Sequence, residues 1–595
     1  MCGFAAIFSY HPGAAPVSEP ELQAINDAMA KRGPDGQGLW FSSDQRIGLA
    51  HRRLAIIDLS KDAAQPMTIT GRDGTPARYH ITYNGEIYNF RALRDELSAE
   101  GIIFNTQSDT EVMLRLYERD GAAMVSRLRG MFALALWDVE KQGLLLARDP
   151  FGIKPLYYSD DGRAIRIASQ VKALMAGGQI DKTPDAAGHA GFHLLGNVPE
   201  PHTLYRHISA LPGGHTLWIE TGGQRQLSSY FDAAKILSQS ESSGEVDLAE
   251  ALRSSVRAHL VADVPVGVFL SSGLDSATLS ALASEQAGAG LDTITLGFDE
   301  FAGTASDEVP LAEQIAAHYG TRQHSQRVSR DDFEAALPQI LGDMDQPTID
   351  GVNTWFVSRV AKRAGLKVAI SGLGGDEIFG GYDSFQQIPK LVSMLGWAGS
   401  LPLFGKATRV ITAPFIKHMT SPKYAGLLEL GPSWGGAWLL RRGLYMPWEL
   451  PEVMDADMAR EGWRDLAPVL RLNQLQENIT QPFRKVSAME IHWYMQNQLL
   501  RDSDWAGMAH SLEIRTPLVD STLFQTLAPA LGRAEGPSKQ KMARTPAKPL
   551  PDNVLKRQKT GFFVPVEQWM KETGTASNGR GLRGWAGKVY SEAIS

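Results

Sequence analysis

The sequence predicts an α/β fold whose C-terminal part is built on a doubly wound parallel sheet. Two short apolar runs, residues 266–270 and 366–370, contain β-branched side chains and are typical of buried parallel strands. Each run ends in a glycine-containing turn with an acidic residue, SSGLDS at 271–276 and SGLGGDE at 371–377. The chain has 595 residues, enough for several domains, so this sheet is expected to form only part of the molecule.

Further elements are expected around these two strands. A helix before the first strand is indicated by apolar residues four positions apart, at Leu248, Leu252, Val256 and Leu260. A strand over 291–298, a helix over 308–318 and a strand over 323–328 follow the first turn. The polar stretch 238–245 is typical of a linker, and the apolar region 391–415 is expected to form helices and loops packed inside a large domain.

The first turn has the chemistry of a phosphate site. It joins a strand to a helix N-terminus, where backbone N–H groups and the helix dipole favour an anion. Asp275 would repel phosphate unless it holds a Mg²⁺ ion that bridges phosphate oxygens. Because both turns end strands of one sheet, Asp275 and Asp376 are expected to share that metal. The alternative is that both acids only cap helices. No G-x-x-x-x-G-K-[ST] motif occurs, which argues against a Walker-type site.

The chain contains one cysteine, Cys2. Removal of Met1 would give this residue a free α-amine with a pKa near ~8, which can serve as the base for the thiol beside it. The alternative is a small buried apolar residue. A sole cysteine at position 2, followed by an apolar strand, favours the nucleophile. A single cysteine also excludes an intramolecular disulfide and a multi-cysteine metal site.

Several polar clusters follow in the first third of the chain. They are a turn at 32–35, a strand with two arginines at 49–58, a strand with a tight Asn-Gly turn at 83–89, and a helix cap at 108–111. Each of these clusters alone is more often structural than functional.

Composition excludes some function classes. The net charge of −7 and a pI near 6.1 argue against a nucleic-acid partner. No uncharged apolar run has membrane-spanning length, and the N-terminus lacks the basic region of a signal peptide, so a cytoplasmic protein without a membrane partner is expected.

In chain order, the motifs MCGFAAIF, RGPDGQG, LAHRRLAIID, YNGEIYN, SDTEV, LRGMFALALWD and ARDPFGIKPLYY resemble the glutamine amidotransferase domain of the N-terminal nucleophile hydrolases. The resemblance covers residues 2–215 and implies an α+β fold, a four-layer αββα sandwich. It implies that Cys2 attacks the glutamine amide, with Asn84 and Gly85 forming the oxyanion hole. It assigns Arg53 to the substrate carboxylate and Glu86 and Asp109 to its ammonium group. The implied glutamine-binding residues are Arg53, Leu54, Ile57, Asn84, Gly85, Glu86 and Asp109.

The first glycine turn resembles the pyrophosphate loop of enzymes that cut ATP between its α and β phosphates, with Ser272 in place of the usual glycine. Together with DWAGMAHSLEIRTP at 504–517 and RQKTGF at 557–562, nearly the whole chain resembles the glutamine-hydrolysing asparagine synthetase family. That implies a doubly wound ATP-pyrophosphatase domain with extra helices, using ATP and Mg²⁺. Lys559 is expected to neutralise charge on phosphate. The implied ATP-binding residues are Leu270, Ser271, Ser272, Gly273, Asp275, Ser276, Leu296, Ser371 and Gly372, with Asp275 and Asp376 as metal ligands.

Departures from the family pattern concentrate in the synthetase part. Leu373 replaces the acid usual at the third position of the second loop, and Gln346 replaces Glu in an Asp-Glu-Pro motif. Asp502 and Trp505 replace a usual Lys and Arg. In the glutaminase part, Gln170 stands where Glu is usual.

The expected organisation is a glutaminase domain at 2–215, a linker at 216–245 and an ATP-dependent domain at 246–595. The expected reaction converts ATP, L-aspartate, L-glutamine and water to AMP, pyrophosphate, L-asparagine and L-glutamate, through a glutamyl thioester on Cys2, internal ammonia transfer and an acyl-adenylate. One alternative keeps the chemistry and changes the acceptor, for example to a sugar uronic acid, which Leu373 favours. Another is an uncoupled glutaminase or nucleotide-binding regulator. The expected partners are small molecules, and the oligomeric state is left open, with a homodimer as one arrangement.

Overall fold

The computed structural model describes residues 2–69, 77–239, 246–288, 290–557, 564–572 and 581–594. Lys559 and most of the RQKTGF motif lie outside the described residues.

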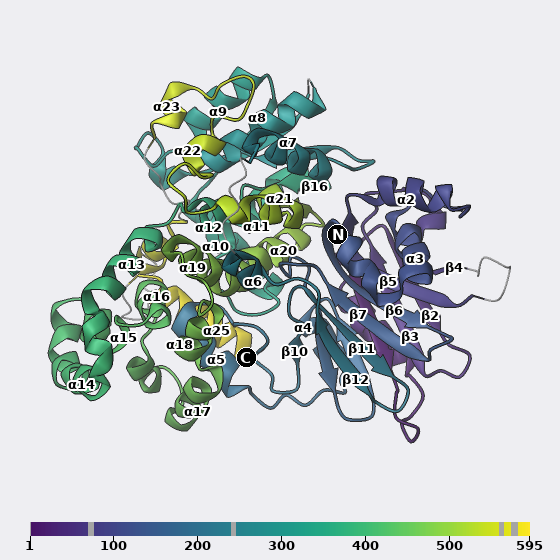
Figure 1. The fold of residues 1–595 in the computed structure, drawn as a ribbon, viewed down its shortest axis with the longest axis horizontal. Helices are drawn as coiled ribbons and strands as arrows, with labels where there is room; N and C mark the ends of the chain where they lie inside the picture. Colours follow the sequence, from purple (N-terminus) through teal and green to yellow (C-terminus); the bar gives the residue numbers. More distant parts are fainter. Residues whose placement is uncertain are drawn as a thin grey trace.

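The N-terminal unit is built on two antiparallel sheets that face each other (Figure 1). The first sheet has the strand order β10-β8-β9-β1-β3-β2, with β10 Ser209–Ala210, β8 Tyr157–Asp160, β9 Ile165–Ala168, β1 Gly3–Phe8, β3 Ile47–Arg53 and β2 Gly36–Phe41. The second has the order β12-β11-β7-β6-β5-β4, with β12 Arg225–Ser229, β11 His215–Glu220, β7 Gly143–Arg148, β6 Gly130–Asp138, β5 Tyr79–Ile87 and β4 Met67–Ile69.

Helices cover the outer faces of both sheets. The first sheet carries α1 (Glu19–Ala28) and α4 (Val171–Ala176), and the second carries α2 (Phe90–Ala99) and α3 (Asp109–Asp120). An apolar cluster fills the space between the sheets, with Phe4 and Phe8 of β1 against Ala133 and Trp137 of β6. The expected four-layer αββα sandwich is therefore confirmed.

Two local expectations differ from the structure. Asn84 and Gly85 do not form a tight turn, because β5 continues through them and pairs with β6 over its whole length. The expected domain end at residue 215 falls inside the second sheet, since β11 and β12 extend it to Ser229.

The C-terminal unit contains the expected parallel sheet, in the order β15-β14-β13-β16-β17. Its strands are β13 Val266–Phe269, β14 Asp292–Phe298, β15 Arg322–Val328, β16 Val368–Ile370 and β17 Glu513–Arg515. The strand order reverses between β13 and β16, so the two glycine loops that follow these strands meet at the topological switch point, where doubly wound folds bind ligands.

Many helices surround the parallel sheet (Figure 1). Those associated with the strands are α7 Leu248–His259, α8 Leu274–Ala287, α9 Val309–Tyr319, α10 Arg330–Asp343, α11 Val352–Arg363 and α12 Gly375–Phe379. The others are α5 Ala186–Leu195, α6 Ala233–Ser238, α13 Ser384–Leu395, α14 Pro402–Met419, α15 Leu427–Leu430, α16 Trp434–Arg442, α17 Ala456–Leu466, α18 Pro468–Leu475, α19 Pro482–Met489, α20 Arg501–Met508, α21 Ser521–Leu527, α22 Lys539–Met542, α23 Asp552–Leu555, α24 Val566–Glu572 and α25 Arg583–Ile594.

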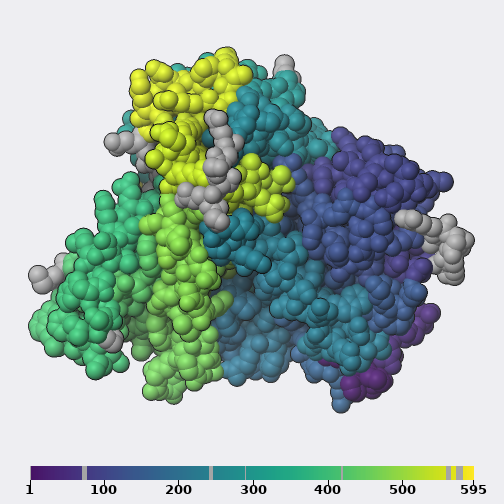
Figure 2. All heavy atoms as spheres, viewed as in Figure 1, coloured from purple at the N-terminus to yellow at the C-terminus, as the bar shows by residue number. Residues whose placement is uncertain are grey.

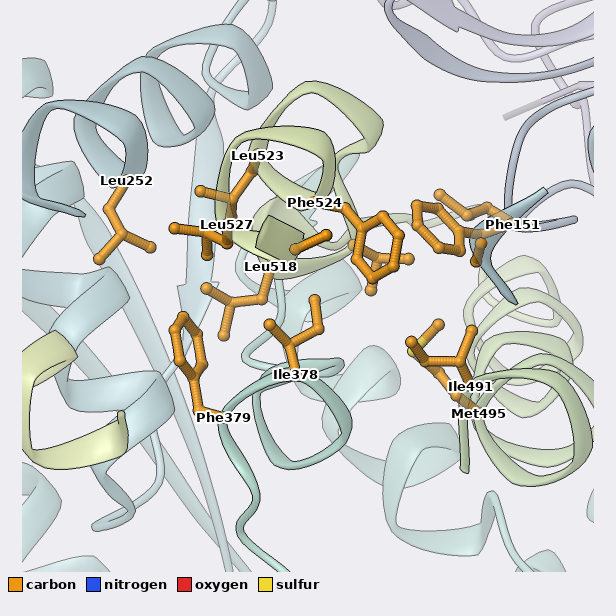
Figure 3. Close-up of a cluster of buried hydrophobic side chains, with 14 of the residues drawn as sticks. Phe151, Leu252, Ile378, Phe379, Ile491, Met495, Leu518, Leu523, Phe524 and Leu527 are labelled. Atoms are coloured by element: carbon orange, nitrogen blue, oxygen red, sulfur yellow. The ribbon is translucent and has the colours of Figure 1, made fainter. Parts of the chain in front are cut away.

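One buried cluster joins the two units. Phe151 of the N-terminal unit packs against Phe524 of α21 with ring centroids 5.4 Å apart, and Leu518 and Ile378 extend the cluster toward the second glycine loop (Figure 3). In Figure 2 the purple-to-blue atoms of the N-terminal unit form the right-hand side of the molecule, against the teal, green and yellow remainder. The two units therefore share a hydrophobic core.

We predict that Leu518→Ala destabilises the protein by about 2–5 kcal/mol, because it removes a fully buried side chain from this shared core. Leu227→Ala, at a position 57% exposed on β12, is the matched control and should cost less than about 0.5 kcal/mol. Chemical denaturation measures both. Equal costs for the two substitutions would contradict the shared core.

Candidate active sites

Cys2 lies immediately before β1 and is buried. Its N–H donates to the Asn84 side-chain oxygen at 3.0 Å, and its sulfur lies 3.9 Å from the Leu54 carbonyl oxygen. Burial raises the pKa of the Cys2 thiol to about 11. At neutral pH the sulfur is therefore a thiol, and a base must remove its proton before it can attack.

Asn84 presents a donor beside this thiol. Its Nδ2 atom is buried and has no hydrogen-bond partner among the described residues, although its Oδ1 atom is engaged by Cys2. A buried, unpaired amide donor is costly unless a ligand satisfies it. Gly85 follows in the same strand, where a Cβ would come within 2.1 Å of the Met131 carbonyl oxygen. Only glycine therefore lets β5 approach β6 this closely.

A cavity that is open to solvent adjoins the thiol. It brings together Cys2 and all but one of the residues expected to bind glutamine: Arg53, Leu54, Ile57, Gly85, Glu86 and Asp109. The exception, Asn84, contacts Cys2 directly. Gln65, Tyr83, Ser108 and Thr110 also line the cavity. Tyr83, Ser108 and Thr110 belong to the polar clusters at 83–89 and 108–111, but none of the four residues was expected to bind glutamine.

The cavity contains both acidic and basic groups. Burial, with the nearby charges of Glu513 and Asp109, raises the pKa of Glu86 well above its ordinary value, and its Oε2 has no hydrogen-bond partner among the described residues. Burial also raises the pKa of Asp109, which accepts hydrogen bonds from the Tyr83 hydroxyl and the Ile87 N–H. A bound cation would relieve both carboxyls. Arg53, held by the carbonyls of Asp58 and Ser60, supplies the opposite charge.

An ion pair links the Cys2 region to the C-terminal unit. The guanidinium of Arg32 forms a bidentate pair with Asp504 of α20, at 2.7 and 3.0 Å, and its Nε donates to the Cys2 carbonyl oxygen at 3.1 Å. Both side chains are almost fully buried. The backbone position of Cys2 therefore depends on contact with α20. The sequence motifs that contain Arg32 and Asp504 do not reveal this pairing.

A second ionic contact reaches the cavity beside Cys2 from β17. Arg515 lies 3.9 Å from Glu86 and 2.7 Å from Glu513, and all three side chains are buried. Arg515 also donates to the carbonyls of His259 and Val261. The C-terminal unit thus places charged groups near both Cys2 and the acidic side of the cavity.

The second site is formed by the two glycine loops. In the first, the Ser276 hydroxyl accepts from the Ser271 N–H and donates to the Ser271 carbonyl, which closes the loop at the start of α8. A Cβ on Gly375 would lie 2.7 Å from the Asp275 carboxyl carbon, and one on Gly372 would lie 3.0 Å from the Ser276 nitrogen. The loops therefore touch, and the glycines are required by this close approach.

All the residues expected to bind ATP lie at or near this edge of the sheet. Leu270 is buried directly after β13, and Leu296 is buried within β14. The Leu270 carbonyl accepts a hydrogen bond from the Thr295 hydroxyl at 2.6 Å. Ser272 is buried, and Gly273 caps α8 without a side-chain hydrogen bond. The helix N-terminus thus retains donors of the kind that bind phosphate.

Asp275 and Asp376 converge on one cation. The ammonium group of Lys539 lies 2.7 Å from Asp275 and also contacts Asp376. Lys539, at the start of α22, was not expected from the sequence. It lies in a turn-rich segment far along the chain from either loop, so no local pattern indicated its contact with the two acids. No cluster of three or more potential protein ligands for a metal occurs in the described part of the chain. Two carboxylates suit Mg²⁺, which usually binds one or two carboxylates, water and substrate phosphates.

Several residues that depart from the family pattern have neighbours in the structure that fit their side chains. Leu373 packs against the shared core. The two substitutions in α20 pair with each other, because the Trp505 indole N–H donates to Asp502 at 2.9 Å. Gln170 is the N-cap residue of α4, but its side chain makes no capping hydrogen bond. Asp345 caps the helix instead, because it accepts from the N–H groups of the first two helical residues at 3.0 Å. An acid at position 170 would add a second negative charge there.

Comparison with known proteins is consistent with this geometry. A family model described as glutamine amidotransferase domain matches residues 1–231, and one described as asparagine synthase matches residues 247–583. Asparagine synthetase [glutamine-hydrolyzing] 1 of Bacillus subtilis is 33% identical over 589 residues, which cover 96% of this chain and 88% of that one. Asparagine synthetase [glutamine-hydrolyzing] 3 of the same organism is 28% identical, covering 92% and 86%. Asparagine synthetase B [glutamine-hydrolyzing] of Escherichia coli is 32% identical, covering 65% and 66%.

We predict that Arg32→Ala destabilises the protein by about 3–5 kcal/mol, because it leaves the buried Asp504 carboxylate without its partner. Lys31→Ala is the matched control: Lys31 pairs with Asp343 but its side chain is 62% exposed, so its loss should cost less than about 1 kcal/mol. Denaturant unfolding measures both. Similar losses for the two neighbours would contradict the importance of the buried pair.

Proposed function

Because the chain belongs to the family of glutamine-hydrolysing asparagine synthetases, which are ATP-dependent carbon–nitrogen ligases, we propose that it makes L-asparagine from L-aspartate. L-Glutamine is the nitrogen donor and ATP is cleaved to AMP and pyrophosphate. The observation that carries the glutaminase half is the buried Cys2 beside the unpaired Asn84 amide.

In the proposed glutaminase step, Met1 is removed and the new α-amine of Cys2 takes the thiol proton. The sulfur attacks the glutamine side-chain carbonyl carbon. The Asn84 Nδ2 and the Gly85 N–H stabilise the oxyanion that forms. The C–N bond then breaks, ammonia leaves with the proton returned by the amine, and water hydrolyses the thioester to glutamate.

The charged groups of the cavity orient glutamine. The Arg53 guanidinium pairs with the α-carboxylate, and the α-ammonium lies between Glu86 and Asp109. This assignment explains why two buried carboxyls, whose pKa values are raised by burial, line the same cavity: the substrate supplies the positive charge that they lack.

In the proposed synthetase step, ATP lies along the two glycine loops with its phosphates at the N-terminus of α8. Asp275 and Asp376 would hold Mg²⁺, which when bound neutralises phosphate charge. Lys539 already occupies the position between the two carboxylates and would turn to the phosphates. Lys559 is proposed for the same electrostatic role. Once aspartate is adenylated, ammonia that has travelled inside the protein displaces AMP.

Leu373 bears on the choice of acceptor. Its contact with the shared core accounts for an apolar side chain at this position without a change of acceptor. Aspartate therefore remains the proposed acceptor, and a uronic acid becomes an outcome that the product assay can reveal.

We expect a reaction with glutamine, Mg-ATP and aspartate to form asparagine and AMP in equal amounts, measured by mass spectrometry. Cys2→Ala should abolish the glutamine-dependent reaction and leave the reaction with ammonium chloride intact, because only the glutaminase site is lost. Chelation of divalent metal should stop AMP formation while glutamate release continues. Glutamate release with no asparagine and no AMP would refute aspartate as the acceptor.

Lys539→Ala should lower the rate of AMP formation by at least about tenfold, since a cation beside the phosphates stabilises developing charge. Lys541→Ala, in the same short helix but 45% exposed in its side chain, should leave the rate unchanged. Glutamate release, measured in both variants without ATP, should be unaffected. If Lys539→Ala lost both glutaminase activity and AMP formation, the variant would be generally misfolded, and this result would contradict the role assigned to Lys539.

A further inference from the structure

The segment from α13 through α14 exposes large apolar side chains. Met394 is 71% exposed, Trp397 58%, Leu403 81%, Ile411 67% and Phe415 71%. The expectation that this apolar region packs inside a large domain is therefore wrong for its outer face. Figure 1 shows α14 at the far left of the molecule, away from the two antiparallel sheets, and Figure 2 shows the same green region at the surface.

The apolar residues of α14 form a stripe that faces outward. Leu403, Ile411 and Phe415 recur at multiples of four positions, so they share one helix face. The opposite face contacts the body: Gly405 is buried, and a Cβ there would lie 2.6 Å from the Leu428 carbonyl oxygen. A surface helix usually turns its apolar stripe toward the core, and here that arrangement is reversed.

The charge of this segment differs from that of the rest of the chain. Residues 384–428 contain no Asp or Glu and five Lys or Arg residues, whereas the whole chain has a net charge of −7. Lys390 and Lys406 are exposed. The apolar stripe thus lies within a stretch of sequence that contains basic residues and no acidic ones.

The segment is fixed to the body of the protein. Arg409 on α14 pairs with Glu429 and stacks over the Trp448 ring, with its guanidinium carbon 4.8 Å from the ring centroid. α14 also packs along α15. The exposed stripe is therefore held in place by the fold.

We propose that the α13–α14 segment docks the protein peripherally on an anionic lipid bilayer, with the apolar stripe in the interface and the lysines at the lipid phosphates. Exposed Trp, Phe and Leu side chains with basic residues and no acids are typical of helices that lie in a membrane interface. No described helix combines the length and apolarity needed to cross a bilayer, so the contact is with the surface.

A second copy of the chain is a poorer fit to the same surface. A two-fold contact places a patch against itself, and here it would bring the exposed Lys390 and Lys406 of one copy toward the same lysines of the other. An anionic lipid surface supplies the missing negative charge over the whole patch. This inference concerns a surface remote from both reaction sites and stands independently of the acceptor.

The test is flotation of the full-length protein with vesicles of phosphatidylglycerol and phosphatidylcholine in equal parts. We expect binding that weakens as salt is raised and is at least about tenfold weaker on vesicles of phosphatidylcholine alone. The combined variant Leu403→Ser, Ile411→Ser and Phe415→Ser should lose at least about tenfold in binding, because it removes the apolar contacts. Lys390→Glu with Lys406→Glu should weaken binding to the anionic vesicles only.

The matched control replaces three other exposed apolar residues, Ile103→Ser, Leu227→Ser and Leu470→Ser, and should bind as the original protein does. Glutamate release and the unfolding midpoint show that each variant is folded. No binding to anionic vesicles, or equal binding by both triple variants, would overturn the proposal. Sedimentation could instead show a dimer that becomes monomeric only in the α14 triple variant, with no vesicle binding. That result would overturn the proposal in favour of self-association.

Discussion

The buried ion pair between Arg32 and Asp504 is the contact on which the arrangement of both sites depends. Charges removed from water must be paired, so neither residue is stable in this place without the other. Because Arg32 also donates to the Cys2 carbonyl, Cys2 is positioned by a residue whose partner belongs to the C-terminal unit. The geometry around Cys2 is therefore complete only when the two units are packed together.

The elements of the C-terminal unit that form its own site also supply contacts to the cavity beside Cys2. β17, which carries Arg515 toward Glu86, is the direct neighbour of β16, and β16 delivers the second glycine loop. The shared core continues from Phe151 through Leu518 to Leu373 in that loop. Strand ends, loops and core thus connect the two sites physically, which is the arrangement that a reaction passing ammonia from one to the other requires.

Periodicity and loop chemistry predicted the elements that depend on local sequence. The strands β13 and β16, the helix α7 and the pairing of the two acidic loops follow from apolar runs and glycine spacing. The prediction of a tight turn at Asn84–Gly85 was wrong, because pairing with β6 overrides the local turn preference. Lys539, Arg32 and Asp504 act through partners more than 150 residues away, which no local pattern reveals. The apolar stripe of α14 has the same periodicity whether it faces solvent or the core, so the sequence pattern could not predict that it is exposed.

The proposed function requires ammonia to pass from the Cys2 site to the synthetase site inside one packed unit. The most direct measurement supplies glutamine labelled with ¹⁵N in its side-chain amide together with an excess of unlabelled ammonium chloride, and reads the label in the amide product by mass spectrometry. We expect the glutamine-dependent product to carry mainly ¹⁵N, at a fraction well above that of free ammonia in solution. A labelled fraction equal to that of the bulk ammonia would show that the two sites exchange through solvent and would contradict it.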